Sequence, residues 1–422
     1  MRTINLPQKY AYFVLTWFIL TGMFNGIVLY FIGIKIKIAV DTFLCTGLFL
    51  LNKRARRFCI KSVLFFFCFL SITCISLIYY INNSHYGFQK LLSNVILTCV
   101  AYLNLFILLL TFKNQTFTKA IVKLFKLQIF LTLFLYIFYI LFNKQNGILK
   151  HSLVQIFILQ DWSGRFQGTF AEPGYLGFWL GAATFISLLV FREKGWPLSF
   201  LLLFILYTAC KAKFALIAVP VAIGSSILPI KYFFSKYHMN LLFIFLCICV
   251  CSLNWYTFAC NFFSFLSNFI FSEGSSTYVT RFSFLLTSIK DICIFPFGHG
   301  FGLNYEVFQP VLTDIIPIAD SVGLETEELR EYFLNPNNMG SKETFSLFAT
   351  SCGFIGIYVY FLYFKKLLCS HYCKPFISTA LILFCFIESL ITGNITGDAY
   401  FFVLLFIKMA LNSNEIRGRA NA

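Results

Sequence analysis

The feature that most constrains this chain is a succession of apolar runs, each close to the length that crosses a lipid bilayer. A hydrocarbon core about 30 Å thick requires roughly 20 apolar residues in a helix. Charged residues make up only 12% of the chain, whereas soluble domains carry about 25%. Because backbone polar groups in a bilayer must be satisfied within the segment, these runs predict an all-α integral membrane protein.

We expect about twelve transmembrane helices in a single polytopic domain that covers residues 1–422. The first run is too long for the apolar region of a cleaved signal peptide, so it is expected to remain as the first span. The expected spans are about 10–33, 36–51, 62–81, 91–112, 127–142, 174–191, 197–210, 214–230, 241–265, 344–364, 376–393 and 398–411.

The distribution of Lys and Arg predicts the orientation. With both termini in the cytoplasm, most of the 33 Lys and Arg fall in cytoplasmic segments, together with only two acids, Glu193 and Glu415. The opposite orientation would place this basic excess outside, against the positive-inside tendency. The same tendency accounts for the net charge of +16, and the sequence carries no nucleic-acid-binding signature.

Two segments on the outer side are long. Residues 143–173 form one, and residues 266–343 form a large loop that holds ten of the 17 Asp and Glu. Within the large loop, helical spacing of Tyr278, Phe282 and Leu285 predicts a helix that ends at Pro296 and lies on the membrane surface. The stretch "ETEELREYF" predicts a second short helix.

Metal and cofactor chemistry is not expected. The 15 cysteines include no CxxC pair, so neither a disulfide framework nor a metal site is predicted. Phosphate-binding loops, dinucleotide glycine motifs, HExxH and serine nucleophile elbows are absent from the sequence.

The stretch "GRFQGTFAEPGYLG" places polar residues before the sixth span. Pro173 suits the first turn of a helix, and Glu172 would then lie at the positive end of the helix dipole. Gly177 and Gly181 form a GxxxG pair that lets a helix or a lipid chain approach closely. Arg165 adds nothing to a helix cap, which favours a functional role.

Further cations are expected on the outer side. Lys211 and Lys213 fall in a tight turn at 210–214, and Arg281 begins the loop helix. The lysines are either interfacial side chains that reach toward water or part of an anion site. If they converge with Arg165 and Arg281, the cluster would bind and stabilise a pyrophosphate.

Other candidates lie further along the chain. His299 stands in the glycine-dense "FPFGHGFGLN", a setting that suggests backbone held close to a ligand. Lys342 and Glu343 precede the tenth span. Glu388 lies within the eleventh span, where a carboxylate is a functional candidate.

Four stretches together resemble the O-antigen polymerase and ligase superfamily of bacterial inner membranes. They are "GRFQGTFAEPGYLGF", "TACKAKFALI", "TRFSFLLTSIKDICIFPFGHGFG" and "SKETFSLFATSCGFIGI", which cover residues of about 160–360 in order. Two positions depart from the family pattern. The turn at 210–214 has lysines where arginine is usual, and a lysine lacks the bidentate fork. Lys342 stands where ligases often have a histidine, and the Glu172-Pro173 block is commoner in polymerases.

The resemblance implies metal-independent glycosyl transfer at the outer face of the bacterial inner membrane. As a polymerase, the protein would move a growing glycan from undecaprenyl pyrophosphate to a lipid-linked repeat unit of O-antigen, capsule or exopolysaccharide. Its partners would be those lipid-linked oligosaccharides, the bilayer, a chain-length regulator and a flippase. The alternatives are an O-antigen ligase, which transfers polymer to lipid A-core, and a polytopic transporter or flippase.

The reaction assigns expected roles to the candidate residues. Cations neutralise the departing pyrophosphate, and a carboxylate or histidine accepts the acceptor proton. Glu172 is the first candidate base, unless it only orients Arg165, and His299 and Glu343 follow. The expected cations are Arg165 and Arg281, with Lys211, Lys213 and Lys342 in pyrophosphate binding.

Overall fold

The computed structural model describes residues 6–23, 34–51, 70–80, 88–111, 118–143, 165–166, 168, 170, 173–227, 254–269, 276–300, 302–334, 344–368 and 376–391. All elements in these ranges are helices, which confirms the all-helical fold for this part of the chain. Glu172, Lys342, Glu343, the twelfth expected span and most of the 143–173 loop lie outside the described residues.

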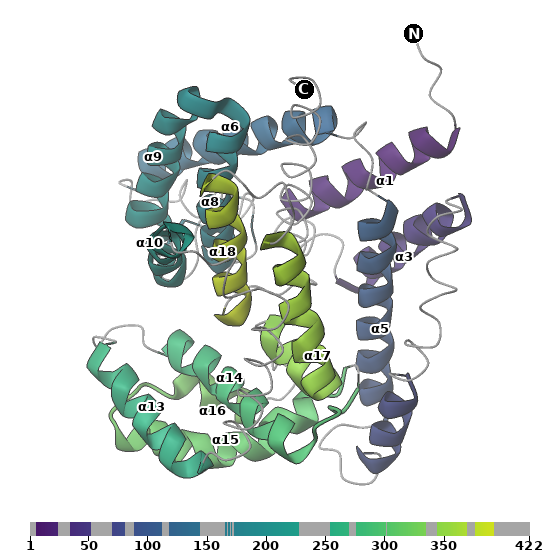
Figure 1. Ribbon diagram of the computed structural model, residues 1–422, viewed down its shortest axis with the longest axis vertical. Helices are drawn as coiled ribbons and strands as arrows, with labels where there is room; N and C mark the ends of the chain where they lie inside the picture. Colours follow the sequence, from purple (N-terminus) through teal and green to yellow (C-terminus); the bar gives the residue numbers. More distant parts are fainter. Residues whose placement is uncertain are drawn as a thin grey trace.

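Most helices overlap the expected apolar runs, although several boundaries differ, and Figure 1 shows their arrangement. The N-terminal part contains α1 (Leu6–Met23), α3 (Ile34–Leu51), a helix at Leu70–Tyr80, α5 (Phe88–Thr111) and α6 (Thr118–Asn143). The central part contains α8 (Pro173–Phe191), the 3-10 turn η2 (Arg192–Gly195), α9 (Trp196–Ile205), the π turn η3 (Leu206–Cys210) and α10 (Lys213–Ile227). The C-terminal part contains α13 (Trp255–Phe269), α14 (Ser276–Ile294), α15 (Asn304–Ser321), α16 (Glu327–Leu334), α17 (Thr344–Leu368) and α18 (Phe376–Ile391).

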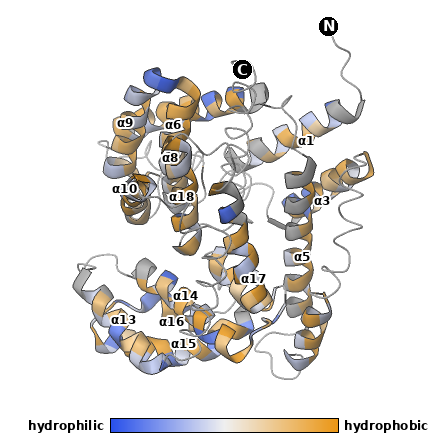
Figure 2. Ribbon diagram, viewed as in Figure 1, coloured by the Kyte–Doolittle hydropathy of each residue, from blue (hydrophilic) through white to orange (hydrophobic). Residues whose placement is uncertain are grey.

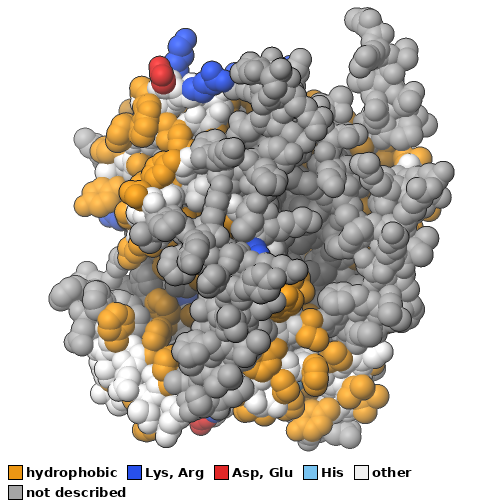
Figure 3. Space-filling view, in the orientation of Figure 1, with side chains coloured by type: hydrophobic (Ala, Val, Ile, Leu, Met, Phe, Trp, Pro, Cys, Tyr) orange, Lys and Arg blue, Asp and Glu red, His pale blue; other side chains and the backbone are white. Residues whose placement is uncertain are grey.

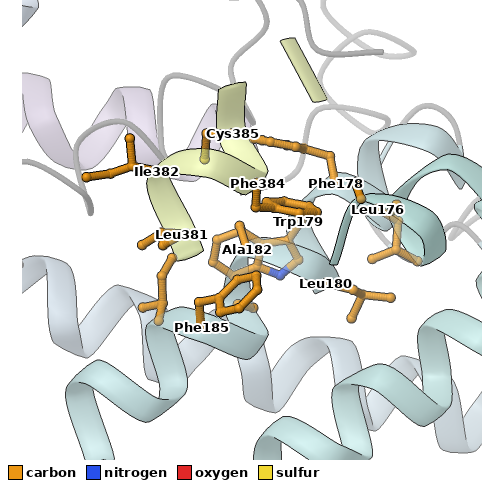
Figure 4. Packing of buried hydrophobic residues seen from close by; sticks show 14 of the residues in the cluster. Leu176, Phe178, Trp179, Leu180, Ala182, Phe185, Leu381, Ile382, Phe384 and Cys385 are labelled. Atoms are coloured by element: carbon orange, nitrogen blue, oxygen red, sulfur yellow. The ribbon is translucent and has the colours of Figure 1, made fainter. Parts of the chain in front are cut away.

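The core of the apolar bundle forms around α8, which packs against α9, α10 and α18. Phe384 of α18 lies between Phe178 and Phe185, with ring centroids 5.8 and 5.9 Å away (Figure 4). A Cβ on Gly181 would lie 2.4 Å from the Phe384 ring, and one on Gly177 would lie 2.2 Å from Cβ of Ala212. The GxxxG pair therefore serves close packing of protein against protein.

Exposed apolar stripes mark the surface that faces lipid. Along α9 and the start of η3, four apolar residues recur at helical spacing and are each more than half exposed: Trp196, Phe200, Phe204 and Tyr207. Apolar side chains also cover the flank of the molecule at α9 and α10 (Figure 3). A water-soluble protein rarely exposes so long an apolar surface, so this stripe indicates contact with lipid.

Helix length supports a membrane-embedded protein as well. Among the described residues, three helical runs are long and apolar enough to cross a membrane, namely Val122–Leu141, Gly174–Cys210 and Thr344–Leu362. The second run contains two helices, α8 and α9, which η2 joins and which pack on each other. The 19 residues of α8 make it about 28 Å long, close to the thickness of a hydrocarbon core.

The helices α13 to α16 form a separate layer with its own core (Figure 1). Phe284, Phe308 and Leu329 are fully buried in it, and Lys290 donates to Asp314 across 2.8 Å at its surface. Figure 2 shows more hydrophilic colour in this layer than along α8 and α18. Both helices predicted within the large loop, α14 and α16, are present.

The expected span 241–265 has the wrong C-terminal boundary. Residues 255–265 belong to α13, and Phe263 of α13 is buried in the core that α13 shares with α14, α15 and α16. The sequence of α13 is apolar enough to extend a membrane span. Only the packing of α15 against α13 shows that α13 belongs to the layer of α13 to α16. Residues 241–253 lie outside the described residues.

The two ends of α8 differ in their surroundings. At its C-terminal end, the Lys126 ammonium lies 5.5 Å from the centre of the Phe191 ring, next to the basic turn Arg192–Gly195. Two segments that the sequence assigns to the cytoplasmic side therefore meet at one end of α8. Helix α6 begins at Thr118, well before the expected residue 127, because Lys favours helix and can extend its charge to water.

Candidate functional site

The N-terminal end of α8 is where the first candidate cation lies. Arg281, in the second turn of α14, is half-buried. Its Nη2 atom lies 3.8 Å from the position that a Cβ on Gly174 would occupy. The first turn of α8 therefore lies close to a guanidinium from a helix more than a hundred residues away in the chain.

Arg165 is held near the same end of α8 by its neighbour. The backbone N–H of Phe166 donates to the carbonyl of Ala209 over 3.0 Å. The Phe166 ring is fully buried and lies 5.8 and 5.2 Å from the rings of Tyr136 and Tyr139. This anchor fixes the backbone of Arg165 beside the residues that lead into the 210–214 turn.

The third cation, Lys211, lies in that turn. The π turn η3 ends at Lys211, which adopts the left-handed conformation with φ 49° and is exposed. A left-handed residue commonly ends a helical turn, and Arg192 at the C-terminal end of α8 has the same conformation, with φ 55°. Gly177 of α8 packs against Ala212 of this turn. A Cβ on Gly177 would lie 3.6 Å from Sγ of Cys210.

These contacts bring three cation-bearing segments to the first two turns of α8. The Arg281 guanidinium lies near Gly174, the N–H of Phe166 donates to Ala209, and Ala212 of the Lys211 turn packs against Gly177. Backbone N–H groups at a helix N-terminus favour anions, and arginine guanidinium groups favour phosphate oxygens. The arrangement therefore has the chemistry to hold a phosphate-bearing group.

Glu388, the carboxylate of the eleventh expected span, is 1% exposed in α18. Helix α18 packs against α8, α10, α14 and α17. A carboxylate buried in an apolar helix is costly unless it is neutral or compensated.

His299 lies away from this cluster. It follows the C-terminal end of α14, and the ten residues between Arg281 and Asp291 separate the two ends by about 15 Å along the helix. The ring is 3% exposed. Its Nε2 is 2.8 Å from Oδ1 of Asp291, and its Nδ1 is 3.2 Å from the Tyr80 hydroxyl.

Burial raises the pKa of Asp291, and the hydrogen bond and charge of His299 partly offset that increase. Sequence analysis did not identify this group, in which Tyr80 lies 219 positions from His299 and Asp291 lies 8 positions from it. Their hydrogen bonds fix the imidazole between α14 and the helix Leu70–Tyr80.

The backbone around His299 packs closely against α17. Gly353 interrupts α17 with φ 56° and ψ −142°. At this break the N–H groups of His299 and Gly300 donate to the carbonyls of Thr350 and Ser351, and the N–H of Phe354 donates to the Pro296 carbonyl. The loop backbone thus takes over hydrogen bonds that a continuous α17 would make to itself.

The side chains of the remaining candidate residues are not described by the structure. Glu172, Lys342 and Glu343 lie outside the described residues, and for Lys213 the structure describes the backbone at the start of α10 but not the side chain. Within the residues that the structure does describe, no group of three or more His, Cys, Asp or Glu side chains is placed to hold a metal ion.

Comparison with known proteins gives no relative to guide the assignment. No family model matches the chain, and no curated protein and no solved structure matches it.

Proposed function

We propose that this protein is a polysaccharide polymerase of the bacterial inner membrane. It transfers a growing glycan from undecaprenyl pyrophosphate to a lipid-linked repeat unit at the outer face. The observation that carries the proposal is the meeting of the Arg281, Arg165 and Lys211 segments at the first turns of α8. That end of a membrane-length apolar helix is where a lipid-anchored pyrophosphate would stand.

The proposed topology has about twelve spans, with both termini in the cytoplasm and the large 266–343 loop outside. It is supported by the opposite character of the two ends of α8. The basic segments around Lys126 and Arg192 lie at one end, and the candidate cations lie at the other. Under the positive-inside tendency the first end is cytoplasmic.

In the proposed reaction, the bond between the anomeric carbon of the donor glycan and the pyrophosphate oxygen breaks. A bond forms between that carbon and a hydroxyl oxygen of the acceptor unit. Arg281, Arg165 and Lys211 neutralise the charge that develops on the leaving pyrophosphate. The acceptor proton passes to a base, and Glu172 remains the first candidate because it directly precedes Pro173 of α8. His299 is a weaker candidate, because its ring is buried and hydrogen-bonded away from Arg281.

The location of the charges distinguishes this proposal from a transporter. Transporters gather their charges near the middle of the bilayer, between two similar halves. Here the cation-bearing segments meet at the beginning of α8, and the sequence has no internal repeat.

Deletion of the gene in its bacterium, followed by glycan gels, tests the proposal. Loss of a polymerase leaves a single repeat unit on the lipid core, or no capsule polymer. Accumulation of full-length polymer on the undecaprenyl carrier would identify a ligase instead. A wild-type ladder of chain lengths after deletion would rule out both activities.

A further inference from the structure

Consecutive exposed apolar residues occupy the C-terminal end of α14 and the turn that follows it. They are Cys293, Ile294, Phe295, Pro296 and Phe297, which we call the 293–297 segment. Ile294 and Phe297 are 58% and 63% exposed. So long a run of exposed apolar residues is unfavourable in water and marks an interaction surface.

The rest of α14 is enclosed by protein. Phe284 and Leu286 are buried in the core of the α13–α16 layer, and Ile292 is buried in the core of the apolar bundle. The sequence predicted that this helix lies on the membrane surface, whereas its middle packs inside the protein. Among the side chains of α14 that the structure describes, only those of Cys293 and Ile294 are exposed.

The 293–297 segment lies close to the helix Leu70–Tyr80. His299 forms the connection, because its Nδ1 is 3.2 Å from the Tyr80 hydroxyl and its ring centroid is 4.3 Å from that of Phe295. A Cβ on the next residue, Gly300, would lie 2.4 Å from Cα of Thr73. The chain that follows the segment therefore packs directly on this helix.

The helix Leu70–Tyr80 exposes an apolar face of its own. Ile75, Ile78 and Tyr79 recur at helical spacing, and each is more than half exposed. Because the helix falls within the third expected span, residues 62–81, lipid is the natural cover for this face. Tyr79 lies near the end of that span, where tyrosine is enriched at the boundary between hydrocarbon and water.

We propose that the 293–297 segment inserts into the membrane interface beside Tyr79, so that lipid covers its apolar side chains. Ring contacts extend the lipid-facing surface to the segment, with centroids 5.2, 5.8 and 4.3 Å apart along the series Tyr79, Tyr80, His299 and Phe295. The segment carries no charge, as burial among lipid headgroups and acyl chains requires. It thereby fixes the depth of the α13–α16 layer relative to the bilayer. This role does not depend on the proposed reaction.

Photocrosslinking of the full-length protein in vesicles of phosphatidylethanolamine and phosphatidylglycerol tests the inference. The photoreactive residue p-benzoylphenylalanine replaces Phe297, and mass spectrometry after irradiation identifies the molecule that it has bonded to. Phe204, exposed on α9, is the lipid-facing control. Leu334 is the water-facing control, because it is 75% exposed at the end of α16, whose first turn is acidic. We expect lipid adducts at Phe297 and Phe204 and none at Leu334.

Three results would overturn the inference. The first is the absence of a lipid adduct at Phe297. The second is equal lipid adducts at Phe297 and Leu334, because exposure alone would then explain the reaction. The third is a bond from position 297 to a peptide, which would show that a second copy or another part of this chain covers the segment. Thermal unfolding checks that each variant is folded; if the Phe297 variant is not, the same probe at Ile294 carries the same expectation.

Discussion

The break in α17 at Gly353 makes a sharp prediction about stability. Gly353 has φ 56° and ψ −142°, and a Cβ there would lie 2.0 Å from the Pro296 carbonyl oxygen. Gly353→Ala therefore adds backbone strain of about 1–3 kcal/mol and overpacking of about 1–3 kcal/mol. We expect a loss of roughly 2–6 kcal/mol in the free energy of unfolding.

The assay is thermal or denaturant unfolding of the purified protein in detergent. The matched control is Gly224→Ala, because Gly224 lies in α10 with no atom within 4 Å of its virtual Cβ. Alanine favours helix by about 1 kcal/mol over glycine, so the control is expected to be as stable as wild type or slightly more so. Equal unfolding of the Gly353→Ala and Gly224→Ala proteins would refute the interlock between the 296–300 loop and α17.

Three further predictions concern the site and its supports. Gly174→Leu is expected to displace the Arg281 guanidinium and abolish polymer. Gly174→Ala places its Cβ 3.8 Å from Nη2 of Arg281 and is expected to lose less polymer. Equal glycan ladders from both variants would argue against the contact. Phe166→Ala removes a fully buried ring and is expected to cost about 3–5 kcal/mol of stability, measured by unfolding, and to reduce polymer because Arg165 loses its anchor. The pKa of Asp291 is raised from its ordinary 3.8, so the folded state binds that proton more tightly and stability falls as pH rises through the interval above 3.8. Asp291→Asn is expected to flatten this dependence in unfolding measured against pH, and an unchanged slope would contradict the burial of a titrating carboxyl.

The sequence predicted the helices well where an apolar run has the length of a membrane span. Apolar runs of membrane length leave few alternatives, so α8, α10 and α18 begin and end within a few residues of the expected ranges. The glycines of α8 were also predicted to permit close approach, and Ala212 and Phe384 occupy that space.

Prediction was weaker where packing decides between equally apolar options. The sequence of α13 suits a span, yet it packs in the core of the α13–α16 layer. The glycines near His299 predicted a close backbone approach, and in the structure the backbone of α17 approaches them. A dense group of glycines predicts that another group approaches the backbone closely, but it does not predict which group.

The candidate site was also predictable from the sequence only in part. Arg165, Lys211 and Arg281 stood out because cations are unexpected on the outer side, and their segments meet at α8. The hydrogen bonds among Tyr80, Asp291 and His299 join elements far apart in the chain. No local pattern marks such a group, because each residue alone is ordinary in its own helix or loop.

The most direct test of the account compares arginines at the two ends of α8. In a deletion strain, Arg165→Ala and Arg281→Ala alter the proposed pyrophosphate site, while Arg192→Ala alters an exposed arginine in η2 at the other end. With protein levels matched by immunoblot, we expect the first two variants to produce no polymer and the third to restore the full glycan ladder. Full ladders from both Arg165→Ala and Arg281→Ala would contradict the assignment of the site.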